Sequence, residues 1–78
     1  MNGNKHIYDY VEYELNIFRN QCNFSDEELT FFNYRAKQKT MEEIGELMNI
    51  SRSKTYAISK SVNTKMNKIK KIYLKNNK

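Results

Sequence analysis

The side chains best suited to chemistry in this 78-residue chain lie on a helical segment that begins near Ser51. Helical spacing turns Thr55 and Ile58 inward, and an arginine left facing outward can donate a forked pair of hydrogen bonds to guanine. An outward alanine can contact a thymine methyl group in the same groove. If the helix enters a major groove of DNA, we expect five outward residues to read bases: Arg52, Ser53, Tyr56, Ala57 and Lys60. For Arg52, simple solvation is the alternative.

A second set of polar residues is better placed for DNA phosphates than for bases. Lys37 and Lys39 fall in the short link before Thr40, where residues of the neighbouring helix commonly touch phosphate oxygens. Solvation alone is the alternative for a lysine such as Lys54. The predicted phosphate contacts are Lys37, Lys39, Thr40, Ser51, Lys54, Lys65 and Lys68.

Two capped helices joined by a tight turn would position these residues. Thr40 and Glu43 form a capping box, and Ser51 marks a second helix start. Asn49 can adopt the left-handed conformation that so short a connection requires, and Gly45 lets the two helices approach closely. An apolar face continues through both helices: Met41, Ile44, Met48, Ile50, Thr55, Ile58 and Val62.

From Thr40 to Met66 the chain resembles the helix-turn-helix of the fourth conserved region of bacterial sigma factors and of LuxR-type response regulators. The run T-x-E-E-I-G-E followed by I-S-R carries this resemblance. The S-R-S-K-T-Y run is similar to small phage-encoded transcriptional activators of Gram-positive hosts. The chain departs from the pattern at Tyr56 and Ala57, where sigma factors often carry arginine and glutamine. The resemblance implies a DNA-binding transcriptional regulator, encoded by a phage or mobile element, that places the helix from Arg52 in the major groove.

The remaining pattern predicts a single all-α domain over residues 1–78 with about four helices. An N-terminal helix is expected at about residues 5–22, a helix-turn-helix core at about 25–62 and a basic helical tail at about 63–78. Within the core, Ser25 and Glu28 form a second capping box, which starts a helix that carries Phe31 and Tyr34 off its inner face. These aromatics and Leu47 would need the N-terminal helix as cover.

Two apolar stripes exceed what the helix-turn-helix core needs. They can cover each other within one chain, or they can hold a homodimer, which is the favoured alternative because such stripes are rarely left exposed. The stripes comprise Ile7, Val11, Leu15 and Phe18 on the N-terminal helix, and Met66, Ile69 and Tyr73 on the tail.

Charge is divided unevenly along the chain. Through Met48 there are five Lys or Arg and nine Asp or Glu, a balance of −4, whereas residues 49–78 carry nine Lys or Arg and no acid, which gives the overall +5. A cationic half that contains the predicted reading helix suits a surface that approaches phosphates. The competing interpretation is a protein-interaction module that keeps the fold but docks on RNA polymerase or another regulator.

The chain has one cysteine, Cys22, and one histidine, His6. These leave nothing from which to assemble a nucleophile, a general base or a metal site, so we expect no enzyme activity, no cofactor and no metal. A lone cysteine suits a reducing cytoplasm. No apolar run reaches the length of a membrane span or a signal peptide, so the expected location is the bacterial cytoplasm or nucleoid.

Overall fold

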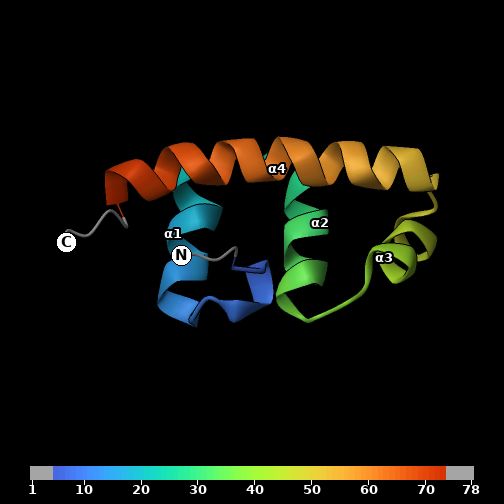
Figure 1. Cartoon of the computed structure of the whole chain (residues 1–78), viewed down its shortest axis with the longest axis horizontal. Coiled ribbons are helices and arrows are strands. Elements are labelled where there is room, and N and C mark those ends of the chain that lie inside the picture. The colour runs from blue at the N-terminus through green and yellow to red at the C-terminus, as the bar shows by residue number, and fades with distance from the viewer. Residues whose placement is uncertain (1–4, 74–78) are drawn as a thin grey trace.

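One long C-terminal helix packs against the other three α-helices and runs the length of the fold. The computed structural model describes residues 5–73. In that range the chain forms a 3-10 turn, η1 (Ile7–Asp9), and four α-helices: α1 (Glu12–Gln21), α2 (Asp26–Ala36), α3 (Met41–Met48) and α4 (Arg52–Tyr73). α1 and α2 cross α4 along its length, and α3 packs at its N-terminal end (Figure 1). The predicted all-α fold is confirmed.

Both predicted capping boxes form. The Ser25 hydroxyl accepts from the Glu28 backbone N–H at 3.2 Å, and the Glu28 carboxylate accepts from the Ser25 N–H at 2.9 Å. At α3 the corresponding Thr40 and Glu43 distances are 3.1 and 2.8 Å. The Thr40 N–H stabilises the ionised carboxylate and lowers the pKa of Glu43. Each box satisfies backbone donors that a helix start leaves free, which fixes where α2 and α3 begin.

The turn between α3 and α4 has the predicted geometry. Asn49 lies in the left-handed region, with φ 57° and ψ 50°, and ends α3. The two helices come so close that a Cβ added at Gly45 would lie 3.0 Å from the Thr55 Oγ1 and 3.4 Å from the Ile50 carbonyl oxygen. Glycine therefore suits this crossing, since a methyl group would press on the Thr55 hydroxyl and anything larger would not fit.

The core contains three phenylalanines from two helices. Phe18 of α1 and Phe31 and Phe32 of α2 are buried, and Ile44 and Val62 extend the same cluster toward α3 and α4. The expectation that the N-terminal segment covers Phe31 agrees with the packing of η1 against α2. For Leu47 the expectation of cover is wrong. Leu47 is 53% exposed, because it lies on the side of α3 that faces away from the core.

The predicted N-terminal helix is not continuous. Tyr10 and Val11 are extended, with ψ 146° and 163°, and separate η1 from α1. Two carboxylates explain the break, because Asp9 accepts from the His6 N–H at 2.9 Å and Glu14 accepts from the Val11 N–H at 3.2 Å. Each starts a new turn. The assignment of Val11 to the apolar stripe is corrected, because Val11 is 62% exposed.

α4 continues from the predicted reading turns into the tail as one rod. Its Met66 is buried in the same cluster as Leu15 and Phe18, and Ile69 packs against that cluster. The Tyr73 hydroxyl donates to the Gln21 Oε1 at 3.1 Å, which ties the end of α4 to the end of α1. Most of the two stripes thus lies in one core within the chain, whereas Val11 and Tyr73 are 62% and 51% exposed. The homodimer stays a prediction. The last part of the predicted tail, 74–78, and residues 1–4 lie outside the described residues.

Candidate nucleic-acid interface

The first turns of α4 are held by contacts on their inner side. The Ser51 hydroxyl accepts from the Lys54 N–H at 3.1 Å, so this residue caps α4 as predicted. The Thr55 hydroxyl donates to the Ser51 carbonyl at 2.9 Å, and both Thr55 and Ile58 are buried. With one side fixed against α3, the opposite side of these turns must face solvent.

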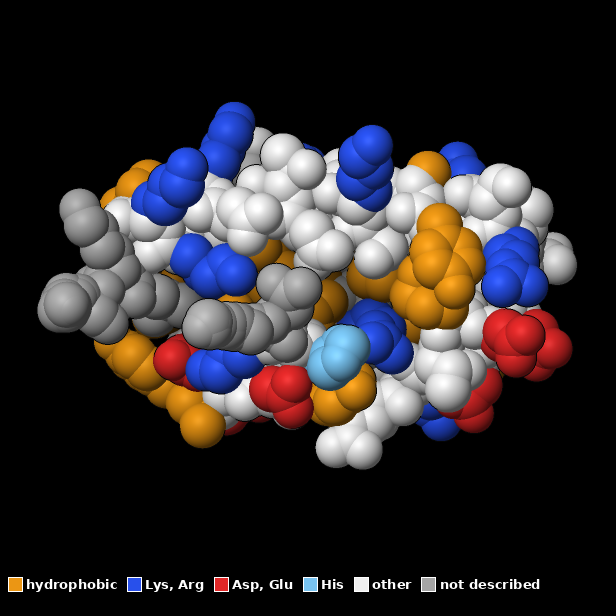
Figure 2. Space-filling model, in the orientation of Figure 1, with side chains coloured by type: hydrophobic (Ala, Val, Ile, Leu, Met, Phe, Trp, Pro, Cys, Tyr) orange, Lys and Arg blue, Asp and Glu red, His pale blue; other side chains and the backbone are white. Residues whose placement is uncertain are grey.

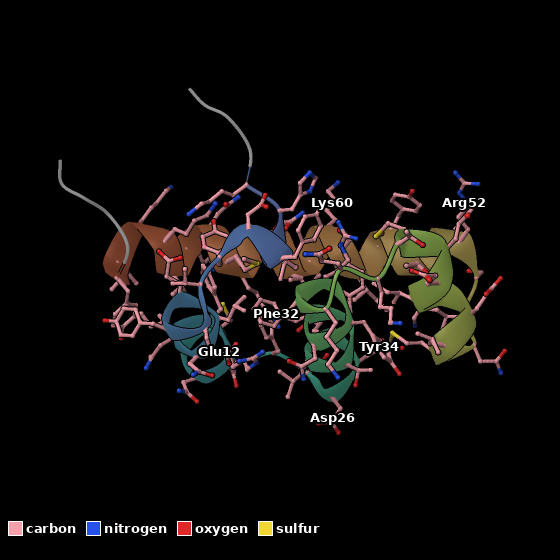
Figure 3. The ribbon with its side chains drawn as sticks, turned by 90° about the horizontal axis from the view of Figure 1, so that it is seen from below. Glu12, Asp26, Phe32, Tyr34, Arg52 and Lys60 are labelled. Carbon is pink, nitrogen blue, oxygen red and sulfur yellow. The ribbon has the colours of Figure 1, made fainter. Side chains whose placement is uncertain are left out.

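All five predicted base-reading residues lie on this solvent side. Tyr56 is 49% exposed, and the Arg52 guanidinium carbon lies 5.8 Å from the centroid of its ring. In Figure 3, the labelled Arg52 and Lys60 both project from the upper edge of α4. The structure thus brings together on one exposed surface Arg52, Ser53, Tyr56, Ala57 and Lys60, which we call the reading face.

Two carboxylates border the reading face and were missed by sequence reasoning. Glu42 and Glu46 of α3 line a groove of about 530 Å³ that also includes Arg52 and Tyr56. Their spacing of four residues places both on one side of α3, a signal that the sequence contained. Carboxylates repel phosphate groups. The exposed side of α3 is therefore unfavourable for a phosphate group.

The predicted phosphate contacts near the link between α2 and α3 have mixed surroundings. Lys37 is exposed, whereas Lys39 is half-buried and its carbonyl oxygen accepts from the Arg35 Nη1 at 2.5 Å. The Thr40 hydroxyl already accepts the cap hydrogen bond, but its own proton remains available for donation. Of the three, Lys37 presents its charge most openly.

The lysines of α4 differ more than their sequence suggests. Lys54 lies 3.6 Å from Glu27 as an exposed ion pair, which is a weak interaction, and Lys68 is exposed. Lys65 instead donates to the Glu28 Oε1 at 2.5 Å and to the Asn23 carbonyl at 3.3 Å. Its ammonium group is committed to the fold, so a phosphate would have to compete with a carboxylate for it.

Glu28 is the centre of this buried connection between α2 and α4. Its side chain accepts hydrogen bonds from both Lys65 and the Ser61 hydroxyl. These two bonds, led by the one from Lys65, lower the pKa of Glu28 to about 2 from an ordinary value of 4.5. Sequence reasoning assigned Glu28 only to a helix cap, since its partners lie more than thirty residues away along the chain.

Comparison with known proteins adds no assignment. No family model matches the chain, and neither a curated protein nor a solved structure was found that matches it. Within residues 5–73, no helix combines the length and apolar character needed to cross a membrane. The same part of the chain contains no group of three or more His, Cys, Asp or Glu side chains that could hold a metal ion.

Proposed function

We propose that this protein is a DNA-binding transcriptional regulator that inserts the first turns of α4 into a major groove. The reading face supports this proposal most directly, because five polar or small residues are exposed together at the start of one helix. Across its whole length, Arg52–Tyr73, α4 carries seven Lys or Arg and no Asp or Glu. A helix of this charge approaches the phosphate backbone favourably.

The dimensions of α4 limit which part can read bases. The 22 residues of α4 span about 33 Å. The major groove is only about 12 Å wide, so a straight helix can reach its floor over only a few turns. We propose that Arg52 to Lys60 occupy the groove and that later turns pass over the bordering strand.

We further propose that the DNA-bound form is a monomer on a single site. Leu15, Phe18 and Met66 lie in one core within the chain, so a second copy is not needed to cover them. Sedimentation equilibrium over the micromolar range should give one species near 9.4 kDa. A species of twice that mass would restore the homodimer.

A protein-docking role is the second candidate, and one observation favours it. Leu47 is exposed on α3, next to Glu46 in the chain and one helical turn after Glu43, and an apolar residue among acids suits a basic protein surface better than DNA. In this alternative the target is RNA polymerase or another regulator. The domain would then use α3, rather than the reading face, as its contact.

Fluorescence anisotropy on a random duplex across a salt series separates the two functions. DNA binding should weaken steeply with salt, because each neutralised phosphate contributes a slope of about −0.9 in log K against log salt. The matched variants are Arg52→Gln with Lys60→Gln, and Glu42→Gln with Glu46→Gln. The first pair should lower affinity and slope, and the second should raise affinity. Affinity that does not change with salt or with either pair would refute the DNA-binding proposal.

A further inference from the structure

An open hollow of about 640 Å³ lies beside the reading face and shares only Tyr56 with the predicted DNA contacts. It is bounded by the N-terminal segment around η1, the end of α2 and the middle of α4. Figure 2 shows blue basic side chains on this face, above and beside the pale blue histidine. The polar residues that line it are Lys5, His6, Arg35, Ser59, Asn63, Asn67 and Lys70, together with Tyr56.

The charge of this hollow is positive. Among the described residues no carboxylate lines it, whereas Lys5, Arg35 and Lys70 do. Two acids of the N-terminal segment, Asp9 and Glu14, are already engaged. Asp9 accepts from the His6 N–H, and Glu14 accepts from the Val11 N–H and lies 4.0 Å from Lys5. An anion entering the hollow would therefore meet cations and amides rather than free carboxylates.

Arg35 is held in position rather than free to follow solvent. Its guanidinium carbon lies 5.2 Å from the centroid of the Tyr8 ring, and its Nη1 donates to the Lys39 carbonyl. Asn63 and Asn67, in contrast, are exposed, and their side chains form no hydrogen bond with another described residue. The hollow thus combines one fixed cation with amide donors that are available to a ligand.

On α4, the residues that line the hollow lie at and beyond one major-groove width from Tyr56. Tyr56 borders both surfaces, and Asn63, Asn67 and Lys70 follow it along α4. At a rise of 1.5 Å per residue, these three lie about 10, 16 and 21 Å farther along the helix axis. With Tyr56 at the bases and a groove about 12 Å wide, this part of α4 reaches the strand that borders the groove.

We propose that the hollow binds backbone phosphates of that bordering strand, with Lys70 and Arg35 as the cations and Asn63 and Asn67 as donors. The inference rests on the proposed function, since it places the DNA by the reading face. It also gives the N-terminal segment an indirect role, because the Tyr8 ring packs against the Arg35 guanidinium and helps to hold it in place. Because phosphates carry no base identity, this site strengthens binding to all sequences alike.

The test compares two adjacent lysines of α4. Lys70 lines the hollow and Lys71 does not, yet both are lysines of the last turns of the same helix. Lys70→Gln should reduce the salt slope by about 0.9 and lower affinity for specific and random duplexes by roughly eightfold near 0.1 M salt. Lys71→Gln should have a clearly smaller effect. Equal effects of the two variants overturn the hollow as a phosphate site.

Two further measurements make each failure recognisable. Asn67→Asp places a carboxylate in the hollow at an exposed position and should weaken DNA binding, whereas Asn20→Asp on the exposed side of α1 should not. Thermal melting by circular dichroism establishes that each variant is folded. If wild-type protein binds no DNA, the proposed function itself fails. If wild-type protein binds DNA and Asn67→Asp binds equally well, only the hollow is refuted. Saturation by inorganic phosphate, with no loss of DNA affinity, would identify a free anion as the ligand instead.

Discussion

Two stretches of α4 have similar compositions and opposite surroundings. From Arg52 to Lys60 the polar side chains of the outward side are exposed, and they form the reading face. From Ser61 to Met66 the helix is tied to α2, because Ser61 and Lys65 both donate to Glu28. Lys60 and Lys65 are only five residues apart. Lys60 presents its charge to solvent, whereas the Lys65 ammonium group pairs with the Glu28 carboxylate.

The contrast shows that a run of basic residues is not one functional surface. Which lysines are free to contact a ligand depends on what packs against each side of the helix. Here α2 packs against one side of the middle turns. The first stretch is supported from below by the close crossing at Gly45. The second is anchored by an ion pair. Each support can be removed separately.

The largest effect is expected from Gly45→Leu. A leucine cannot fit where even an added Cβ would lie 3.0 Å from the Thr55 Oγ1, so α3 and the first turns of α4 must separate. We expect a loss of about 3 kcal/mol in unfolding free energy by urea denaturation, together with loss of DNA binding. Leu47→Ala, on the exposed side of the same helix, should change stability by less than about 0.5 kcal/mol. A Gly45→Leu protein as stable as wild type would disprove the crossing.

Gly45→Ala should be close to neutral. The gain of about 1 kcal/mol from replacing glycine in a helix opposes the pressure on Thr55. Combining it with Thr55→Ala removes the close contact. A double-mutant cycle should then give a favourable coupling between the two alanines, and additive effects would mean that the contact stores no strain.

Glu28→Gln should loosen the second stretch and leave the reading face intact. Removing the charge leaves Lys65 without its carboxylate, at an expected loss of about 2 kcal/mol near neutral pH. The matched variant Glu27→Gln breaks only the exposed pair with Lys54 and should cost less than about 0.5 kcal/mol.

The pH dependence of this loss follows from the lowered pKa of Glu28. A carboxyl whose pKa is lowered by folding stabilises the fold above its ordinary value of 4.5 and loses that contribution as the pH falls toward about 2. Wild type and Glu28→Gln should therefore converge in unfolding free energy as the pH falls through this window. A constant difference between them would show that the ion pair is not the cause.

Arg52→Ala should lower affinity for a selected specific duplex by about 1 to 3 kcal/mol, and lower it less on random DNA. Arg52→Lys retains the charge but not the fork, so it should keep the affinity for random DNA and still lose specificity. Anisotropy on both duplexes measures the difference. An equal loss on specific and random DNA would assign Arg52 to phosphates instead of bases.

Lys68→Ala is expected to change DNA binding alone. Lys68 is exposed, so its removal should reduce the salt slope by about 0.9 on every duplex and leave stability unchanged. Lys65→Ala should lower stability and leave the salt slope nearly unchanged, because it leaves Glu28 buried without its partner. If Lys65→Ala lowers the salt slope as much as Lys68→Ala does, the distinction between the two stretches is wrong.

Local chemistry explains which parts of the fold the sequence predicts well. The caps at Ser25 and Thr40 join residues three apart, and Asn49 adopts its conformation from its own side-chain chemistry. These features depend on neighbours in the chain. The helix-turn-helix arrangement and the outward direction of the reading face follow from them.

The features that sequence did not predict need partners from distant elements or a choice between equal signals. The bond from Lys65 to Glu28 joins α4 to α2, and the hollow requires three elements at once. At the N-terminus, the spacing of Ile7 and Leu15 fits one helix, but carboxylates at Asp9 and Glu14 each start a separate turn. Helical spacing alone cannot show whether the apolar pattern or the two capping carboxylates decide the local structure.

The single cysteine of the chain allows opening of the core to be followed by thiol alkylation. Cys22 is buried at the end of α1, and burial raises the pKa of its thiol to about 11. Because the thiolate is the reactive species, alkylation in the folded protein must wait for the packing around Cys22 to open. The rate of alkylation then measures how often this part of the core opens locally. Cys22 thus serves as a native probe of local unfolding, and no label has to be added to the protein.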